Sequence, residues 1–380
     1  MGAHRGLCVG LLPSVSAGST WGVHTGSVRA SRSESPIEET VPAVRADNLY
    51  KVFGKHSRSA VERLSDGSHR DTITDLDVTA AVIDVSFEVE PGETFVVMGL
   101  SGSGKSTLIR MLNGLLEPTA GTVEVDGVDI TALSKKNLLN LRGEKISMVF
   151  QHFALLPHRT VLENAAYGLE LRGITKDERE SRAMRNLEMV GLEGWEDKLP
   201  HQLSGGMQQR VGLARALAAD TDIILMDEAF SALDPLIRRD MQTQLLQLQK
   251  QLGKTIIFIT HDLNEAMRLG DRICVLKDGR VSQIGTAEEI LNQPANEYVT
   301  RFIEDVDRTR VLTAASAIDA DVAADPDARQ VDAATPIAEL YEDMSTADQL
   351  RVVSEKGEVL GMVSRGSVLA ALAPGKEDQG

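Results

Sequence analysis

Residues 99–107 have the spacing of a phosphate-binding loop. The stretch GLSGSGKST fits GxxxxGKS and follows the apolar run TFVVM, which predicts a strand, a loop and a helix in the required order. Glycines let backbone N–H groups converge on phosphate oxygens, Lys105 brings positive charge to the β and γ phosphates, and Ser106 offers a hydroxyl to magnesium. The residues expected to bind the nucleotide are Gly99, Leu100, Ser101, Gly102, Ser103, Gly104, Lys105, Ser106 and Thr107.

Two carboxylates end the apolar run DIILMDEAF. Adjacent acids after a strand usually belong to a solvated loop, but here the apolar residues predict a buried strand that brings both acids to the edge of the sheet that holds the phosphate loop. Asp227 is the expected magnesium partner, by direct contact or through water, and Glu228 is the candidate general base.

Single polar residues follow two other predicted strands. Gln151 comes after KISMVF and is a candidate for contact with the metal and the attacking water, while His261 comes after TIIFIT and is a candidate for a hydrogen bond to the γ phosphate. Each alone is an ordinary strand terminus. In an open parallel sheet, however, ligands bind beyond the carboxyl ends of the strands, and both residues are expected there with Glu228.

A second helix start suited to an anion occurs at residues 203–210, LSGGMQQR. Ser204, Gly205 and Gly206 precede a predicted helix whose N-terminal backbone carries about half a positive charge. One phosphate chain does not easily occupy two such sites. Either the chain folds both loops together, or two chains face each other head to tail.

Short β-rich runs alternate with longer helical patterns from residue 80 onward, which predicts an α/β fold with a largely parallel sheet. The expected strands are 80–89, 94–99, 145–150, 222–227, 255–260 and 272–279. The expected helices are 105–115, 176–190, 206–219 and 235–252, and the segment 160–200 is expected to be mostly helical.

Composition limits the function. The 380 residues predict two domains, and the net charge of −16 with 4% aromatic residues argues against nucleic acid as a partner.

Two cysteines, Cys8 and Cys274, form neither a disulfide framework nor a metal motif, which favours a reducing cytosol. No apolar run reaches the roughly 18 to 20 residues that span a bilayer. Residues 1–43 are interpreted as a disordered extension rather than an export signal, because GLCVGL is short.

The C-terminal region has a different composition. After residue 310 the chain has thirteen acidic and five basic side chains, so half of the net charge lies there. Residues 309–334 are expected to be an acidic linker. Residues 335–373 predict helix, strand, a turn at Lys356 and Gly357, strand, helix.

These motifs occur in the order seen in the ATP-binding subunits of ABC transporters, which the chain resembles over about residues 44–308. The resemblance implies a P-loop NTPase domain with a RecA-like mixed sheet, a helical subdomain at about 152–205, ATP with Mg²⁺, and a position on the cytoplasmic face of the membrane. It also implies a head-to-tail homodimer in which the Ser204–Gly206 loop serves the partner's ATP. Asp234 would lie at the dimer seam, and residues 152–164 would meet the permease.

A narrower resemblance is to the glycine betaine/proline importers, carried by MVFQHFALLPHRTVLENAAYGLEL, LMDEAFSALDPLIRRDMQ and ILNQPANEYV. It implies that Phe53 stacks on adenine, with Tyr50 as the second candidate and a plain core role for Phe53 as the alternative. Residues 54–80 match an insert of these importers. An extracytoplasmic substrate-binding protein would be an indirect partner.

The C-terminal unit, 335–373, resembles one CBS module of these importers, and residues 311–318 are a candidate start of a degenerate first copy. A plain capping tail is the alternative to the regulatory module. Two other functions stay open. The cargo of the importer could be an amino acid such as methionine, or the chain could be a non-transport ABC ATPase, although it has neither a second nucleotide domain nor a coiled-coil insertion.

Overall fold

The computed structural model describes residues 41–67, 69–323 and 325–373. The prediction of a disordered extension over 1–43 falls almost wholly outside these ranges. The described elements lie in one compact unit that begins at Thr40. In these three ranges, no helix combines the length and the apolar character needed to cross a bilayer.

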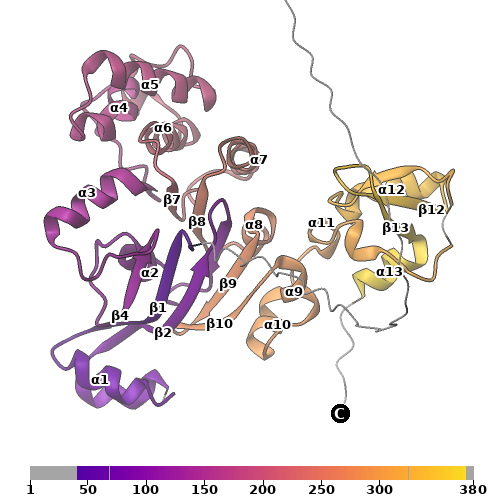
Figure 1. The fold of residues 1–380 in the computed structure, drawn as a ribbon, viewed down its shortest axis with the longest axis horizontal. Coiled ribbons are helices and arrows are strands. Elements are labelled where there is room, and N and C mark those ends of the chain that lie inside the picture. The colour runs from indigo at the N-terminus through magenta and orange to yellow at the C-terminus, as the bar shows by residue number, and fades with distance from the viewer. Residues whose placement is uncertain (1–40, 68, 324, 374–380) are drawn as a thin grey trace, which may run out of the picture. The chain divides into compact units, whose positions relative to one another are not determined.

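A six-stranded sheet holds most of the predicted parallel strands (Figure 1), with strand order β10-β9-β3-β8-β7-β6. Its strands are β3 (Thr94–Met98), β6 (Ile146–Val149), β7 (Ile223–Asp227), β8 (Thr255–Thr260), β9 (Arg272–Lys277) and β10 (Arg280–Gly285). All neighbours pair in parallel except β10, which pairs antiparallel with β9. The predicted α/β class is confirmed, and β10 is a strand that the sequence analysis did not predict.

The central strands are buried on both faces. Every residue of β3, β7 and β8 is buried. Successive side chains of a strand point to opposite faces, and so Phe95 and Val97 join one core while Val96 and Met98 join the other. These two cores fix the strands, and thereby fix the position of their carboxyl ends.

A second sheet corrects one sequence prediction. The strand expected at 80–89 exists as β2 (Thr79–Val89), but it lies in a four-stranded antiparallel sheet with order β2-β1-β4-β5 and not in the parallel sheet. The other strands are β1 (Val44–Phe53), β4 (Ala120–Val125) and β5 (Val128–Asp129). In β2 buried and exposed residues largely alternate, the pattern of a strand with one buried face.

Helices cover the sheets and form a helical subdomain. They are α2 (Lys105–Leu112), α3 (Lys135–Lys145), α4 (Val161–Leu171), α5 (Lys176–Met189), η2 (Pro200–Gln202), α6 (Gly205–Ala218), α7 (Pro235–Leu252), α8 (Leu263–Leu269), α9 (Ala287–Asn292), α10 (Glu297–Ile303) and α11 (Arg308–Val311). The four predicted helices are confirmed. Helices α4, α5 and α6 pack on one another, so α6 ties the helical subdomain to β6.

The insert at 54–80 contains α1 (Ser57–Leu64) and the 3₁₀ helix η1 (Arg70–Leu76). Leu64 and Ile73 are buried in a small core with Tyr50 and Ile83 from β1 and β2. The insert therefore packs on the antiparallel sheet.

The C-terminal unit has a three-stranded sheet, β11-β12-β13. Its elements are η3 (Ala315–Ala317), β11 (Gln330–Asp332), α12 (Ile337–Thr346), β12 (Gln349–Val353), β13 (Val359–Ser364) and α13 (Arg365–Leu372). The predicted order of helix, strand, strand, helix is present. Residues 309–334 differ from the expected linker, because they contain most of α11 and all of η3 and β11, and because Leu312 and Val331 are buried. The many Asp and Ala residues of this stretch led to the prediction of a linker, because the apolar residues among them are widely spaced.

Candidate nucleotide-binding site

The loop between β3 and α2 requires glycine for steric reasons. Gly99 and Gly104 have positive φ angles of 153° and 101°. A Cβ atom at Gly99 would lie 2.3 Å from the carbonyl oxygen of Leu276, and one at Gly104 would lie 2.1 Å from that of Ala81. The loop therefore lies against backbone atoms on two sides, and it can adopt this shape only because Gly99 and Gly104 have no Cβ atom.

Lys105 begins α2 and is 5% exposed. Its Nζ donates hydrogen bonds to the carbonyl oxygens of Gly99 (2.8 Å) and Leu100 (3.1 Å), so the ammonium lies over the loop that it follows. Burial lowers the pKa of Lys105, and the nearby carboxylates of Glu228 and Asp227 oppose that shift. Together with the loop N–H groups, the ammonium can bind a polyphosphate.

Ser106 and Asp227 come together although they are far apart in the sequence. The Ser106 hydroxyl donates to Oδ1 of Asp227 at 3.3 Å. Burial raises the pKa of Asp227, Glu228 adds to this shift, and the hydrogen bond from Ser106 opposes it. A hydroxyl and one carboxylate suit Mg²⁺, which completes its coordination with phosphate oxygens and water. Within the described ranges no group of three or more His, Cys, Asp or Glu could hold a metal.

Glu228 lies where three loops meet. It has a left-handed φ of 44°, and its N–H donates to the carbonyl oxygen of Ile259 at 3.0 Å. Its Oε2 accepts a hydrogen bond from Gln151 Nε2 at 3.2 Å and lies 3.0 Å from Nδ1 of His261. Gln151 Nε2 also lies 3.3 Å from Oγ of Ser231. The structure thus joins three of the predicted catalytic side chains in one hydrogen-bonded group.

The second anion loop lies at the start of α6. Ser204 caps this helix, and its Oγ accepts from the N–H of Met207 at 3.4 Å. A Cβ atom at Gly206 would lie 2.5 Å from Cγ2 of Ile237, and one at Gly205 would lie 3.8 Å from the ring of Phe153. These neighbours all lie outside the loop 99–107.

Comparison with known proteins identifies the family. A family model described as ABC transporter matches residues 82–231. The glycine betaine transport ATP-binding protein OpuAA of Bacillus subtilis is 59% identical over 281 residues, which cover 73% of this chain and 67% of that protein. The glycine betaine/carnitine transport ATP-binding protein GbuA of Listeria monocytogenes is 46% identical, and the match covers 87% of this chain and 97% of that protein. The chain belongs to the ABC transporter family of ATP-binding proteins.

A solved structure supports the same assignment. The ATP-binding cassette MJ0796, in a dimeric post-hydrolysis state bound to ADP and Pi, matches with a TM-score of 0.55 and 35% identity. The match covers 64% of this chain and 98% of that one. The predicted ATP and Mg²⁺ follow from the family, and the residues described above fit both.

Phe53 and Tyr50 differ in exposure within this ABC ATPase. Phe53 ends β1 and is 44% exposed, with the Lys51 ammonium 5.4 Å from its ring centroid. Tyr50 is 5% exposed and belongs to the core under the insert. A plain core role therefore fits Tyr50 and not Phe53.

Asp234 caps α7, and its Oδ1 accepts from the N–H of Ile237 at 3.1 Å. The sequence analysis missed the partner of this segment, Arg238. Its guanidinium donates to the carbonyl oxygens of Ser231 (3.3 Å) and Leu233 (3.1 Å) and pairs with Asp262 at 3.1 Å. The segment 231–234 is thus tied to the residue that follows His261. The sequence feature that could have indicated this role is an arginine in the first turn of α7, shortly after the capping Asp234.

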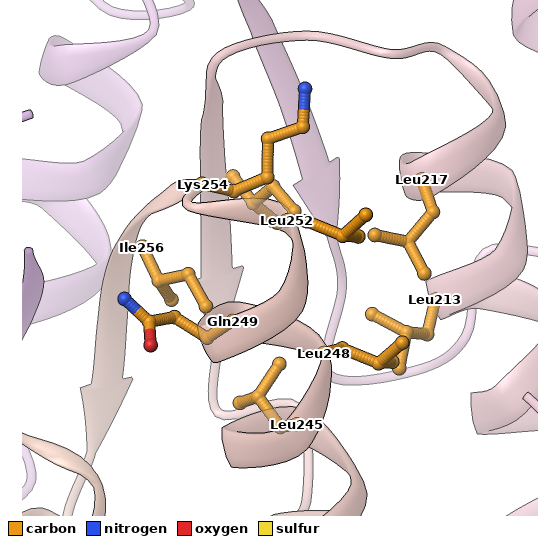
Figure 2. Close-up of a pocket in the computed structure, with 9 residues that line it drawn as sticks. Leu213, Leu217, Leu245, Leu248, Gln249, Leu252, Lys254 and Ile256 are labelled. Atoms are coloured by element: carbon orange, nitrogen blue, oxygen red, sulfur yellow. The ribbon is translucent and has the colours of Figure 1, made fainter. Parts of the chain in front are cut away.

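A cavity between α6 and α7 is not the site. Figure 2 shows the leucine side chains of the two helices facing one another across it. Its volume is about 10 Å³, and it reaches Ile224 and Ile256 near the amino ends of β7 and β8. Asp227 and His261 lie at the opposite ends of those strands. The cavity is a small packing gap in the apolar core.

Proposed function

We propose that this chain hydrolyses ATP to drive import of a quaternary amine of the glycine betaine type. The observation that supports ATP hydrolysis is the placement of the Glu228 carboxylate, partly buried near Lys105 of the phosphate loop and held by Gln151 and His261. The relatives support the cargo.

Each side chain has a role in the reaction. Lys105 and the loop N–H groups hold the phosphates, and Ser106 and Asp227 would hold Mg²⁺, which neutralises phosphate charge. Glu228 orients the attacking water and takes its proton, while Gln151 fixes the carboxylate and meets the water and the metal. His261 donates to the γ phosphate. Catalysis is then mainly positional and electrostatic.

A second copy of the chain completes the site. The neighbours of the Ser204–Gly206 loop lie outside its own phosphate loop, which favours the head-to-tail arrangement over one shared site. The MJ0796 cassette, which matches this chain, is dimeric. In the proposed dimer Asp234 lies at the seam, and the loop of one chain closes on the ATP of the other.

Other subunits complete the importer. The chain lies on the cytoplasmic face of the membrane, and residues 152–164 dock on the permease. Asn164 supports this surface, because its buried amide donates to the carbonyl oxygens of Leu156, Arg159 and Thr160 and so shapes the loop. An extracytoplasmic protein delivers the cargo to the permease.

The relatives separate the two cargo hypotheses. Besides the two relatives above, a trimethylamine N-oxide transport ATP-binding protein of Ruegeria pomeroyi is 47% identical, over 87% of this chain and 97% of its own. A methionine import ATP-binding protein of Enterococcus faecalis is 46% identical but matches only 59% of this chain and 65% of its own. The longer matches favour the quaternary amine.

The C-terminal unit is proposed to be a CBS-like regulatory module that pairs across the dimer. Removing residues 311–380 and measuring ATP-driven uptake against salt tests this role. A regulatory unit predicts that the response to ionic strength is lost, whereas an unchanged response would assign the unit a capping role.

Transport in vesicles tests the main proposal. The chain is reconstituted with its permease and a substrate-binding protein, and uptake of radiolabelled glycine betaine and methionine is measured with ATP inside. ATP-dependent uptake of glycine betaine alone is the expected result. Uptake of methionine alone would overturn the cargo.

A further inference from the structure

Two consecutive residues after Gln151 have an unusual backbone. Phe153 and Ala154 have positive φ angles of 56° and 46°. In the described part of the chain, the other non-glycine residues with positive φ are Glu228 and six Asn or Asp, the residue types that adopt this conformation most readily. Such a conformation is unfavourable for a residue with a Cβ atom, and it persists only where the surroundings enforce it.

Arg215 of α6 holds Phe153 and Ala154 in this conformation through two hydrogen bonds. Its Nη1 donates to the carbonyl oxygen of Ala154 at 2.7 Å, and its Nη2 donates to that of Phe153 at 3.1 Å. The Arg215 side chain is partly buried, and desolvation lowers the pKa of its guanidinium. Two carbonyl oxygens side by side match the fixed fork of an arginine, which a lysine cannot reproduce.

The same loop touches α6 at the other end of the helix. The ring of Phe153 lies beside Gly205, where a Cβ atom would be 3.8 Å from Cζ. Phe153 therefore lies between the first turn of α6 and Arg215, three turns further along. On its upstream side the loop ends in Gln151, whose amide contacts Glu228.

We propose that Arg215 is a positioning residue that holds the Gln151–Ala154 loop on α6 and so fixes the Gln151 amide at Glu228. The proposal rests on the proposed ATPase function. In the head-to-tail dimer, the Ser204–Gly206 loop at the start of α6 serves the partner's ATP, and Gln151 serves its own. Through Arg215, the position of the Gln151 amide in one ATP site then depends on the position of the helix α6 that carries the Ser204–Gly206 loop to the other ATP site.

The test compares Arg215 with an arginine outside the site. Arg172 donates to the carbonyl oxygen of Ala219, the C-cap of α6, at 2.6 Å, so Arg172→Met is the control. The full chain carries Arg215→Met, Arg215→Lys or Arg172→Met, and kcat, KM for ATP and Tm are measured. Arg215→Met should lower kcat roughly ten- to a hundredfold with little change in KM. Arg215→Lys should recover part of the loss, and Arg172→Met should leave kcat unchanged.

A double mutant separates positioning from loss of stability. In a Gln151→Ala background, Arg215→Met should lower kcat little further, because the group that it places is gone. Equal, additive effects in both backgrounds, or equal effects of Arg215→Met and Arg172→Met, would overturn the proposal. A wild-type chain without ATP hydrolysis would instead overturn the proposed function.

The exposed Ala154 allows a test that leaves Arg215 intact. Val is strained at a positive φ and Gly is not, so Ala154→Val should lower kcat as Arg215→Met does, whereas Ala154→Gly should not. This pair decides the question if Arg215→Met does not fold. Equal kcat values for Ala154→Val and Ala154→Gly would count against the proposal.

Discussion

Nδ1 of His261 lies 3.0 Å from Oε2 of Glu228, and the two residues follow the neighbouring strands β8 and β7. Which of the two groups donates in this contact depends on which ring nitrogen of His261 carries a hydrogen. The left-handed backbone of Glu228 turns the chain toward β8, where the N–H of Glu228 bonds to Ile259. The adjacent ends of the two strands thus hold the proposed base and the proposed phosphate ligand together.

Replacing Glu228 with Gln should remove the base and keep the shape. We expect kcat to fall by about 10²–10⁴, because an amide cannot take a proton from water at neutral pH. ATP binding should persist, since Lys105 and the phosphate loop are unchanged. Steady-state hydrolysis and equilibrium binding of a fluorescent ATP analogue measure the two effects. Glu188→Gln on the exposed face of α5 is the control, and a kcat within twofold of wild type in Glu228→Gln would contradict the assignment.

Replacing Phe53 with Ala should weaken ATP binding if its ring stacks on adenine. Stacking of a base on an aromatic ring contributes about 1–3 kcal/mol, and the exposed ring of Phe53 is available for it. Phe53→Trp should keep the affinity. Leu139→Ala, at another exposed apolar residue, controls for loss of surface area. Titration calorimetry with ATP measures the affinities, and equal affinity in Phe53→Ala and wild type would assign the base another partner.

Gly206 allows packing to be separated from anion binding. Gly206→Ala should destabilise the protein by about 1–3 kcal/mol, because its Cβ would overlap Cγ2 of Ile237. Ile237→Ala in the same chain removes that atom and should recover most of the Tm. Hydrolysis should stay low in the double mutant if a side chain at 206 also obstructs the partner's γ phosphate. Full recovery of kcat together with Tm would mean that Gly206 serves packing alone.

Sequence reasoning found the strand ends well because the physics there is local. An apolar run predicts a buried strand, and the polar residue after it must lie at the edge of the sheet, which identified Gln151, Asp227 and His261. The long-range partners were not predictable in this way. Arg215 and Arg238 donate hydrogen bonds to backbone carbonyl oxygens. Every residue has such an oxygen, so the sequence does not indicate which of them an arginine will contact.

The acidic C-terminal stretch shows the opposite case. Composition suggested a linker, yet Val331 pairs with Val352 in a parallel ladder and is buried. A strand of three residues gives no period to detect, and its stability depends on a neighbour that follows later in the chain. Such an element is determined by tertiary packing, which composition does not report.

Glu265 predicts a pH dependence of stability behind the site. This carboxyl is 4% exposed, and it accepts from the Thr260 hydroxyl at 2.5 Å and from Nε2 of Gln242 at 3.0 Å. Burial raises the pKa of Glu265 above its ordinary value of 4.5, and Asp262 adds to the shift. The two hydrogen bonds and, more weakly, Arg238 oppose it.

The sign of the effect follows from the raised pKa. The folded state binds the proton of Glu265 more tightly than the unfolded chain, so this contribution to stability is complete below pH 4.5 and is lost as the pH rises through the folded-state pKa. Glu265→Gln has no such titration. We therefore expect the Tm of wild type, relative to Glu265→Gln, to decrease as the pH rises above 4.5. Calorimetry across that range, with Glu188→Gln as the control, measures the difference; a difference that grows with pH would show that the hydrogen bonds outweigh burial at this carboxyl.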